Sequence, residues 1–166
     1  MIRPPRDDDF GSIAAITNHY IATTAIHFAY EPVREDDLRG MWHGYRDRFP
    51  WLVLEEDGHV LGYAKAGTWR DRAAYQWTAE TGLYLAAAAR GHGRGTALYT
   101  ALLDELAARG FHSAVAGITL PNPASVALHV ALGFVSVGIV REAGWKHDRW
   151  HDLEFWQKGF TSGGAS

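Results

Sequence analysis

The strongest limit on the fold comes from RGHGRGT, residues 90–96, which separates an apolar stretch from a helical pattern. The preceding LYLAAAA is expected to end a strand, and Leu98, Leu102 and Leu106 recur at the spacing of one helix face. A helix N-terminus has unpaired backbone N–H groups, and glycine lets an anion approach them closely. The pattern therefore predicts an anion-binding loop, with a tight turn carrying solvated arginines as the alternative.

Two common phosphate-binding loops do not fit this segment. The glycines stand at 91, 93 and 95, not in the G-x-G-x-x-G order of a Rossmann dinucleotide site. The next expected strand, FHSAVAGI, also ends without the acid that would hold a ribose. A Walker A loop fails because no Gly-Lys-Ser/Thr follows. The anion must belong to another class of ligand.

The rest of the chain predicts an α/β sandwich of helices around a mixed sheet. Apolar periodicity separates helices from strands. Helices are expected at residues 8–21, 35–48, 96–109 and 123–132. Strands are expected at residues 1–3, 51–56, 59–67, 74–85, 111–118, 134–140 and 151–160, with a hairpin turn at Asp57-Gly58. We expect residues 1–160 to form a single domain and residues 161–166 to be a flexible C-terminal tail.

Composition excludes several classes of function. The 166 residues carry a formal net charge of −3, which argues against a nucleic-acid partner. There is no cysteine, so disulfides, zinc–thiolate sites and thiol catalysis are excluded, which is compatible with a reducing compartment. No apolar run reaches the roughly 18 residues of a membrane span, and the N-terminus lacks the apolar core of a signal peptide. We expect a cytoplasmic protein without a membrane partner.

The glycine-rich loop resembles a known coenzyme site. Arg90, Gly93 and Gly95 match R-x-x-G-x-G, the coenzyme A pyrophosphate signature of the GCN5-related N-acetyltransferases (GNAT). The segment NPASVALHVALGF resembles that family's second coenzyme segment, an Asn opening a helix that ends in Gly-Phe. The resemblance extends from Met1 to Phe160. It implies a GNAT fold: a mixed, mostly antiparallel sheet flanked by about four helices and splayed between strands 4 and 5.

Several longer stretches resemble one branch of that family, the phosphinothricin acetyltransferases. They are NHYI, FAYEP, WRDRAAYQWTAE and GWKHDRWHDLEFWQ. The branch acetylates phosphinothricin, methionine sulfoximine and similar glutamate-like amino acids. The resemblance implies direct attack of a small amino-acid substrate on acetyl-CoA in a ternary complex, and a homodimer. Acetylation of another amine or a peptide N-terminus, and a non-catalytic acyl-CoA-binding module, are the alternatives.

The resemblance assigns catalysis to Glu80 and His129. An α-amino group titrates near pH 8, so most of the acceptor is protonated at pH 7 and a base must remove the proton. Glu80 lies in the otherwise charge-free WTAETGLYL, and an exposed strand carboxylate is the alternative role. His129 stands where most of the superfamily has a tyrosine. An imidazole can move a proton at neutral pH, but a packing role is the alternative.

The resemblance also assigns the coenzyme and acceptor contacts. Backbone N–H groups at residues 83–85 would stabilise the developing oxyanion, and Asn122 would hold the pantetheine arm besides capping its helix. The coenzyme-binding residues are expected to be Leu83, Tyr84, Leu85, Arg90, Gly91, His92, Gly93, Arg94, Gly95, Thr96, Asn122 and Ser125. The substrate-binding residues are expected to be Phe28, Arg70, Arg72 and Tyr75, since arginine suits capture of a carboxylate. A solvated turn is the alternative for the two arginines.

Two features complicate the assignment of the acceptor and of a metal. The branch usually has Ser or Thr two residues after the catalytic Glu, and this chain has Gly82, which leaves the acceptor identity open. His147 and His151, with Asp148 and Asp152, have the composition of a metal cluster. No other ligand set accompanies them and acetyl transfer needs no metal, so we expect none.

Overall fold

A seven-stranded sheet forms the centre of the molecule in the computed structural model, which describes residues 1–160. Its strand order is β1-β2-β3-β4-β5-β7-β6. All neighbouring strands are antiparallel except β4 and β5. The mixed, mostly antiparallel sheet predicted from the sequence is therefore confirmed. The expected tail, residues 161–166, lies outside the described residues.

The order of elements follows the sequence patterns closely. The strands are β1 (Ile2–Arg3), β2 (Trp51–Glu56), β3 (His59–Thr68), β4 (Thr78–Leu85), β5 (Ser113–Thr119), β6 (Val135–Lys146) and β7 (Arg149–Gly159). The helices are α1 (Phe10–Thr23), α2 (Glu35–Tyr45), α3 (Arg94–Ala108) and α4 (Pro123–Ala131). β4 begins later than predicted because residues 73–75 form a short 3₁₀ turn. Within residues 1–160, no helix has the length and apolar character needed to span a membrane.

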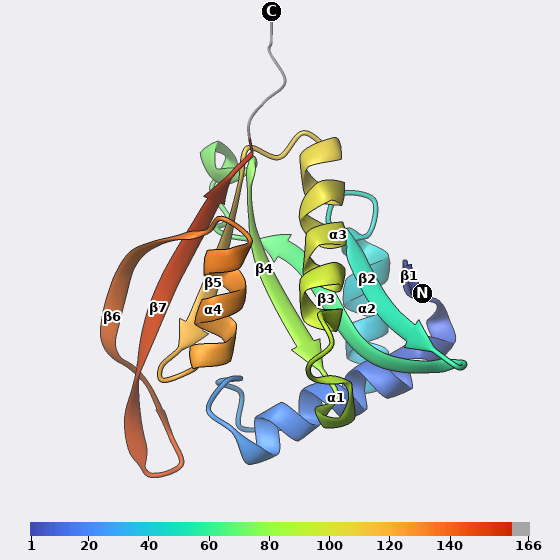
Figure 1. The fold of residues 1–166 in the computed structure, drawn as a ribbon, viewed down its shortest axis with the longest axis horizontal. Helices are drawn as coiled ribbons and strands as arrows, with labels where there is room; N and C mark the ends of the chain where they lie inside the picture. Colours follow the sequence, from blue (N-terminus) through green and yellow to red (C-terminus); the bar gives the residue numbers. More distant parts are fainter. Residues whose placement is uncertain (161–166) are drawn as a thin grey trace, which may run out of the picture.

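Helices cover both faces of the sheet (Figure 1). On one face, α1 and α2 pack around a core that includes Phe10, Trp42 and Tyr63. On the other face, α3 packs around a core that includes Leu98 and Ala64, and α4 adds its partly buried apolar side chains there. Successive side chains of a strand point to opposite faces, so Tyr63 and Ala64 of β3 belong to different cores. This alternation decides which side chains of β3 and β4 can meet.

The sheet opens at its centre between β4 and β5. These strands pair only from Thr78 to Glu80, opposite residues 113–115 of β5. Beyond Glu80 they diverge, while β4 remains paired with β3 as far as Leu85 (Figure 1). The edge of β4 that faces β5 therefore has no strand partner in its second half, and the predicted splay between strands 4 and 5 is confirmed.

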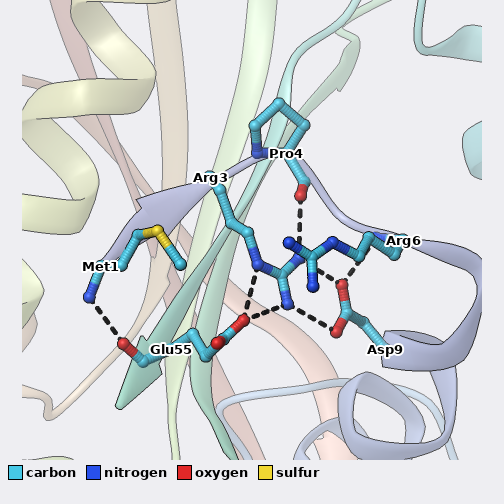
Figure 2. A network of polar contacts seen from close by, with 6 residues as sticks. All are labelled: Met1, Arg3, Pro4, Arg6, Asp9 and Glu55. Carbon is cyan, nitrogen blue, oxygen red and sulfur yellow. Dashed lines mark hydrogen bonds and ion pairs between the residues drawn. The ribbon is translucent and has the colours of Figure 1, made fainter. Parts of the chain in front are cut away.

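The N-terminal strand is tied to the start of α1 by a buried ionic network (Figure 2). The Arg3 guanidinium donates to both carboxylate oxygens of Asp9, at 2.7 and 2.9 Å, and to Glu55 at 2.6 Å. Burial opposes ionisation of Asp9, but hydrogen bonds from Arg3 and from the Arg6 backbone outweigh it and lower the pKa of Asp9. Charged groups that are paired in this way fix α1 against the sheet edge.

Candidate active site

A cavity of about 920 Å³ occupies the opening between β4 and β5. Its walls combine parts of β3, β4 and β5, the glycine-rich loop, α4 along its length, and side chains from α1 and α2. The residues predicted to act at the site that line it are Glu80, Leu83, Tyr84, Leu85, Arg90, Gly91, Gly93, Gly95, Thr96, Asn122, Ser125 and His129. One cavity therefore brings together the loop, the strand edge and both predicted acid–base groups.

The glycine-rich loop presents a row of free backbone donors. Gly91, His92 and Gly93 have φ angles of 87°, 55° and 72°, a left-handed run that glycine adopts without strain. Among residues 1–160, none of their N–H groups has an acceptor. α3 begins at Arg94, so the N–H groups of its first turn lack intrahelical partners as well. Such a concave row of N–H groups at a helix N-terminus suits a phosphate.

The structure separates the two arginines of the loop. Arg90 lines the cavity, and its guanidinium donates to the Tyr20 hydroxyl at 3.2 Å. Arg94 instead forms a two-pronged ion pair with Glu56, at 2.8 and 2.7 Å. Neither Arg94 nor His92 is among the residues of the cavity wall. Of the three predicted cationic contacts, only Arg90 therefore lies on the cavity wall.

Asn122 caps α4 with one end of its amide. Its Oδ1 accepts a hydrogen bond from the Ser125 backbone N–H at 3.2 Å, and Pro123 occupies the first helical position. Among the described residues, its Nδ2 has no acceptor, and the side chain lies on the cavity wall. The capping role and a ligand contact are therefore compatible, because they use different atoms.

Glu80 lies where β4 loses its partner strand. It is the last β4 residue that pairs with β5. Its side chain is open to the cavity, yet the surrounding protein displaces enough water to raise its pKa, and the nearby Lys65 charge only partly offsets this. A carboxylate with a raised pKa is a stronger base than a free one, which suits proton abstraction. The other half of β4, Leu83 to Leu85, lines the same cavity.

His129 is buried and both of its ring nitrogens are engaged. Nδ1 lies 2.7 Å from the Ser125 carbonyl and must donate to it, so Nε2 is the acceptor for the Tyr99 hydroxyl at 3.1 Å. The Tyr99 hydroxyl lies 2.7 Å from Thr81 Oγ1. Burial lowers the pKa of His129, and the Ser125 carbonyl only partly compensates. The lowered pKa favours the neutral imidazole, which joins a hydrogen-bonded chain through Tyr99 and Thr81 to the Val115 carbonyl of β5.

The residues predicted to hold the acceptor do not reach the cavity wall. Arg70 is exposed and its guanidinium lies over the Trp69 and Tyr75 rings, at 5.1 and 6.0 Å. Arg72 is also exposed, at the start of the 3₁₀ turn. Phe28 packs against β6, where a Cβ on Gly144 would lie 2.6 Å from its ring. The acceptor roles of Phe28, Arg70, Arg72 and Tyr75 remain predictions.

Sequence reasoning missed many residues of the cavity wall, and two of them, Lys65 and Tyr20, carry polar groups that matter for the site. The Tyr20 hydroxyl donates to the Leu85 carbonyl at 2.7 Å and accepts from Arg90, so α1 links β4 to the loop. Lys65 is the only charged residue in the strand segment VLGYAKAG. A single charge within an otherwise apolar strand identified Glu80 as a candidate site residue. The same pattern could have identified Lys65.

The two histidines near the C-terminus contact backbone carbonyl groups. His151 is buried with its Nε2 2.8 Å from the Lys146 carbonyl, and His147 Nε2 lies 3.2 Å from the Thr24 carbonyl. Within residues 1–160, no three His, Asp or Glu side chains gather as metal ligands would.

Together these features define a class of enzyme. A cradle for a phosphate, an unpaired strand edge and a basic carboxylate share one cavity, which is the arrangement needed to move an acyl group from a phosphate-bearing thioester to an amine. The chain matches the family model "Acetyltransferase (GNAT) family" over residues 13–134. The chain therefore belongs to the GNAT family, whose members use acetyl-CoA, and it is an N-acetyltransferase.

Several similar proteins support this assignment. A phosphinothricin N-acetyltransferase from Streptomyces viridochromogenes is 45% identical over 159 residues, covering 96% of this chain and 87% of that protein. An L-methionine sulfoximine/L-methionine sulfone acetyltransferase from Salmonella typhimurium is 38% identical over 90% of this chain and 88% of its own. The crystal structure of a GNAT superfamily phosphinothricin acetyltransferase from Sinorhizobium meliloti in complex with AcCoA superposes with a TM-score of 0.94 at 34% identity, covering 100% of this chain and 91% of that chain.

Proposed function

We propose that this enzyme acetylates the amino group of a small glutamate-like amino acid, of the phosphinothricin, methionine sulfoximine or methionine sulfone type. The observation that carries the proposal is the shared cavity, in which Glu80 and the anion-binding loop face one space large enough for a coenzyme arm and a small acceptor. The named substrates of relatives with 45% and 38% identity support this acceptor class. The acceptor attacks directly in a ternary complex.

The chain's own groups fit acetyl-CoA at the loop end of the cavity. The N–H groups of residues 91–96 and the Arg90 guanidinium would hold the pyrophosphate. The Asn122 Nδ2 and the free edge of β4 would hold the pantetheine arm. When bound, acetyl-CoA supplies an activated thioester carbonyl and a thiolate leaving group. The side chains of His92 and Arg94 have no direct part in this proposal, because neither residue lies on the cavity wall.

Glu80 is the proposed general base. Its carboxylate lies at the point where the strands part, so an amine entering from the acceptor side meets it before the β4 edge. Glu80 takes the ammonium proton, directly or through one water. Backbone N–H groups between Leu83 and Leu85 donate to the carbonyl oxygen as negative charge develops there.

His129 is proposed to hold or move a proton through its hydrogen-bonded chain. Because Nδ1 is held by Ser125, only Nε2 can exchange a proton, and it does so through the Tyr99 hydroxyl. Burial raises the pKa of the Tyr99 hydroxyl above its ordinary value. In this proposal the hydroxyl therefore stays neutral as it passes a proton along the chain. The Thr81 hydroxyl in turn donates to the Val115 carbonyl of β5 at 3.3 Å, on the sheet face opposite to the Glu80 side chain.

We also propose that the enzyme is a cytoplasmic homodimer. β6 is an edge strand whose residues Val135, Val137 and Ile139 are 63%, 55% and 40% exposed, and a second copy would cover them. Light scattering at micromolar concentration tests this: a dimer mass is expected, and a monomer mass would reject the dimer.

The cytoplasmic location is supported by the absence of cysteine.

The experiment that tests the function is release of free coenzyme A from acetyl-CoA, followed by a thiol assay. Phosphinothricin, methionine sulfoximine, methionine sulfone and glutamate are supplied as acceptors, and a peptide N-terminus as the competitor. We expect turnover with at least one of the first three. Turnover with the peptide alone would show that the acceptor is a peptide N-terminus and not a free amino acid. Binding of acetyl-CoA without turnover of any amine would point to a non-catalytic module.

A further inference from the structure

Lys65 places a cation inside the acceptor side of the cavity. It lies on β3 directly opposite Gly82 of β4, and it shares a sheet face with Tyr63, two residues earlier. That face is the one covered by α1 and α2, because Tyr63 belongs to their core. The Lys65 side chain also lines the cavity. It is therefore a wall residue of the site and not a surface charge.

The Lys65 ammonium has no counter-ion of its own. Among residues 1–160, no group accepts a hydrogen bond from its Nζ within 3.5 Å, and no carboxylate lies within 4.0 Å of it. Its one close polar contact is with the Trp51 ring, whose centroid is 5.2 Å from Nζ. Burial lowers the pKa of Lys65, and Glu80 only partly compensates. A desolvated ammonium of this kind is stabilised by an anion that enters the cavity.

Gly82 leaves room for that cation. A Cβ built at Gly82 would meet only the Tyr84 ring, at 3.5 Å, which is an ordinary contact. Glycine is therefore not required there by the backbone or by packing. Its effect is to leave the position opposite Lys65 without a side chain, where the resembled branch usually has Ser or Thr. The Lys65–Gly82 pair gives this cavity a cation next to an open space.

Lys65 and Glu80 face the same space without touching. Glu80 precedes Gly82 by two residues, so it is the diagonal cross-strand neighbour of Lys65 on the same face. Diagonal positions lie about 7–8 Å apart, which leaves room for a small group between two side chains. No ion pair joins them at the 4.0 Å limit. A carboxylate and an ammonium at this spacing match the two charges of an α-amino acid, whose amino and carboxylate groups share one carbon.

We propose that Lys65 binds the α-carboxylate of the acceptor while Glu80 faces its amino group. This assignment rests on the proposed function and makes it more specific: the acceptor is a free α-amino acid, and a peptide N-terminus, which lacks that carboxylate, is a poor substrate. Besides Glu80, His27 is a titratable group near Lys65, and burial, followed by the Lys65 and Lys146 charges, lowers its pKa. Recognition of the acceptor α-carboxylate is therefore assigned to Lys65.

The test pairs two acceptors with a set of variants. Methionine sulfone and its carboxamide differ only in the charge of the carboxyl group, and kcat/KM is measured for both by coenzyme A release. In the wild type we expect the acid to be preferred at least about tenfold. Lys65→Met should lower kcat/KM for the acid about 10- to 100-fold, mainly through KM, and change the carboxamide less than about threefold. Lys65→Arg, which keeps the charge, should retain most of the preference.

Two comparators complete the experiment. Arg149→Met removes an exposed cation at the β6–β7 turn and should leave the preference unchanged. Gly82→Ser should reduce the preference by a few-fold, because its hydroxyl occupies the space beside Lys65. Acetyl-CoA binding by calorimetry shows that each variant is folded.

The outcomes separate this inference from the proposed function. Equal loss for acid and carboxamide in Lys65→Met, or loss of the preference in Arg70→Met but not in Lys65→Met, overturns the Lys65 assignment alone. A wild type that acetylates no free amino acid but does acetylate a peptide rejects the proposed acceptor class, and the Lys65 assignment with it.

Discussion

The two sides of the cavity are built from different parts of the chain. The coenzyme side uses backbone groups of one continuous segment, residues 90–96, and the N-terminus of α4. The acceptor side uses side chains from separate strands, with Glu80 on β4 and Lys65 on β3. In the proposed function, backbone donors bind the phosphate that every coenzyme molecule carries. Side chains on neighbouring strands can change independently, so acceptor choice can vary while the coenzyme site stays the same.

This division predicts that changes on one side leave binding on the other side intact. Substitutions on each side of the cavity test this independence.

Glu80→Gln should lower kcat by about 10²- to 10⁴-fold, because it removes the proposed base while keeping the shape of the side chain. The dissociation constant of acetyl-CoA, measured by calorimetry, should stay within about twofold of the wild type because the change lies on the acceptor side. An unchanged kcat would remove Glu80 from the mechanism, and a large loss of coenzyme binding would contradict the separation of the two sides.

Gly93→Ala should raise the dissociation constant of acetyl-CoA about tenfold. Gly93 has a φ of 72°, and a Cβ in this conformation costs roughly 1–2 kcal/mol. The acceptor KM should change little. The matched control is Gly40→Ala on α2, where an added Cβ meets nothing within 4 Å and φ is not in the left-handed region. Equal coenzyme affinities for both variants would show that the loop conformation is not what binds the ligand.

The pH dependence of kcat/KM should link the two acceptor-side charges. Glu80 must be unprotonated to act, and burial raises its pKa, so activity should be lost as pH falls through a value above that of an ordinary glutamate. Lys65 partly lowers the pKa of Glu80, so Lys65→Met should move this acidic limb to higher pH. Profiles measured with the carboxamide acceptor isolate this effect. A limb that stays in place would show that the two charges do not interact.

Arg94→Met should have the smallest effect, raising the KM for acetyl-CoA by less than about threefold. Arg94 is partly exposed and paired with Glu56, and such surface pairs contribute little. Arg90→Met, on the cavity wall, should raise the same KM more. The reverse order in initial-rate measurements would mean that Arg94 leaves Glu56 and binds the coenzyme.

Much of the fold was predictable because its signals are local. The Asp57-Gly58 turn adopts positive φ angles of 50° and 78°, and Leu98, Leu102 and Leu106 are fully buried on one face of α3, as their spacing predicted. The start of β4 was predicted too early, because the Ala73–Tyr75 segment is apolar enough for a strand but forms a 3₁₀ turn. Apolar spacing alone does not distinguish the start of a strand from a short 3₁₀ turn.

By itself, the sequence determined the order of elements, the glycine-rich loop before α3, the Asn122 cap and the charged residue in the centre of β4. These features depend on residues that are neighbours in the chain, so backbone geometry and periodicity are enough to predict them. Only the tertiary structure decided that Arg94 pairs with Glu56, that His129 joins Tyr99, and that Lys65 lies opposite Gly82. Each of these contacts joins residues far apart in sequence, and strand register and helix packing alone determine which of them meet.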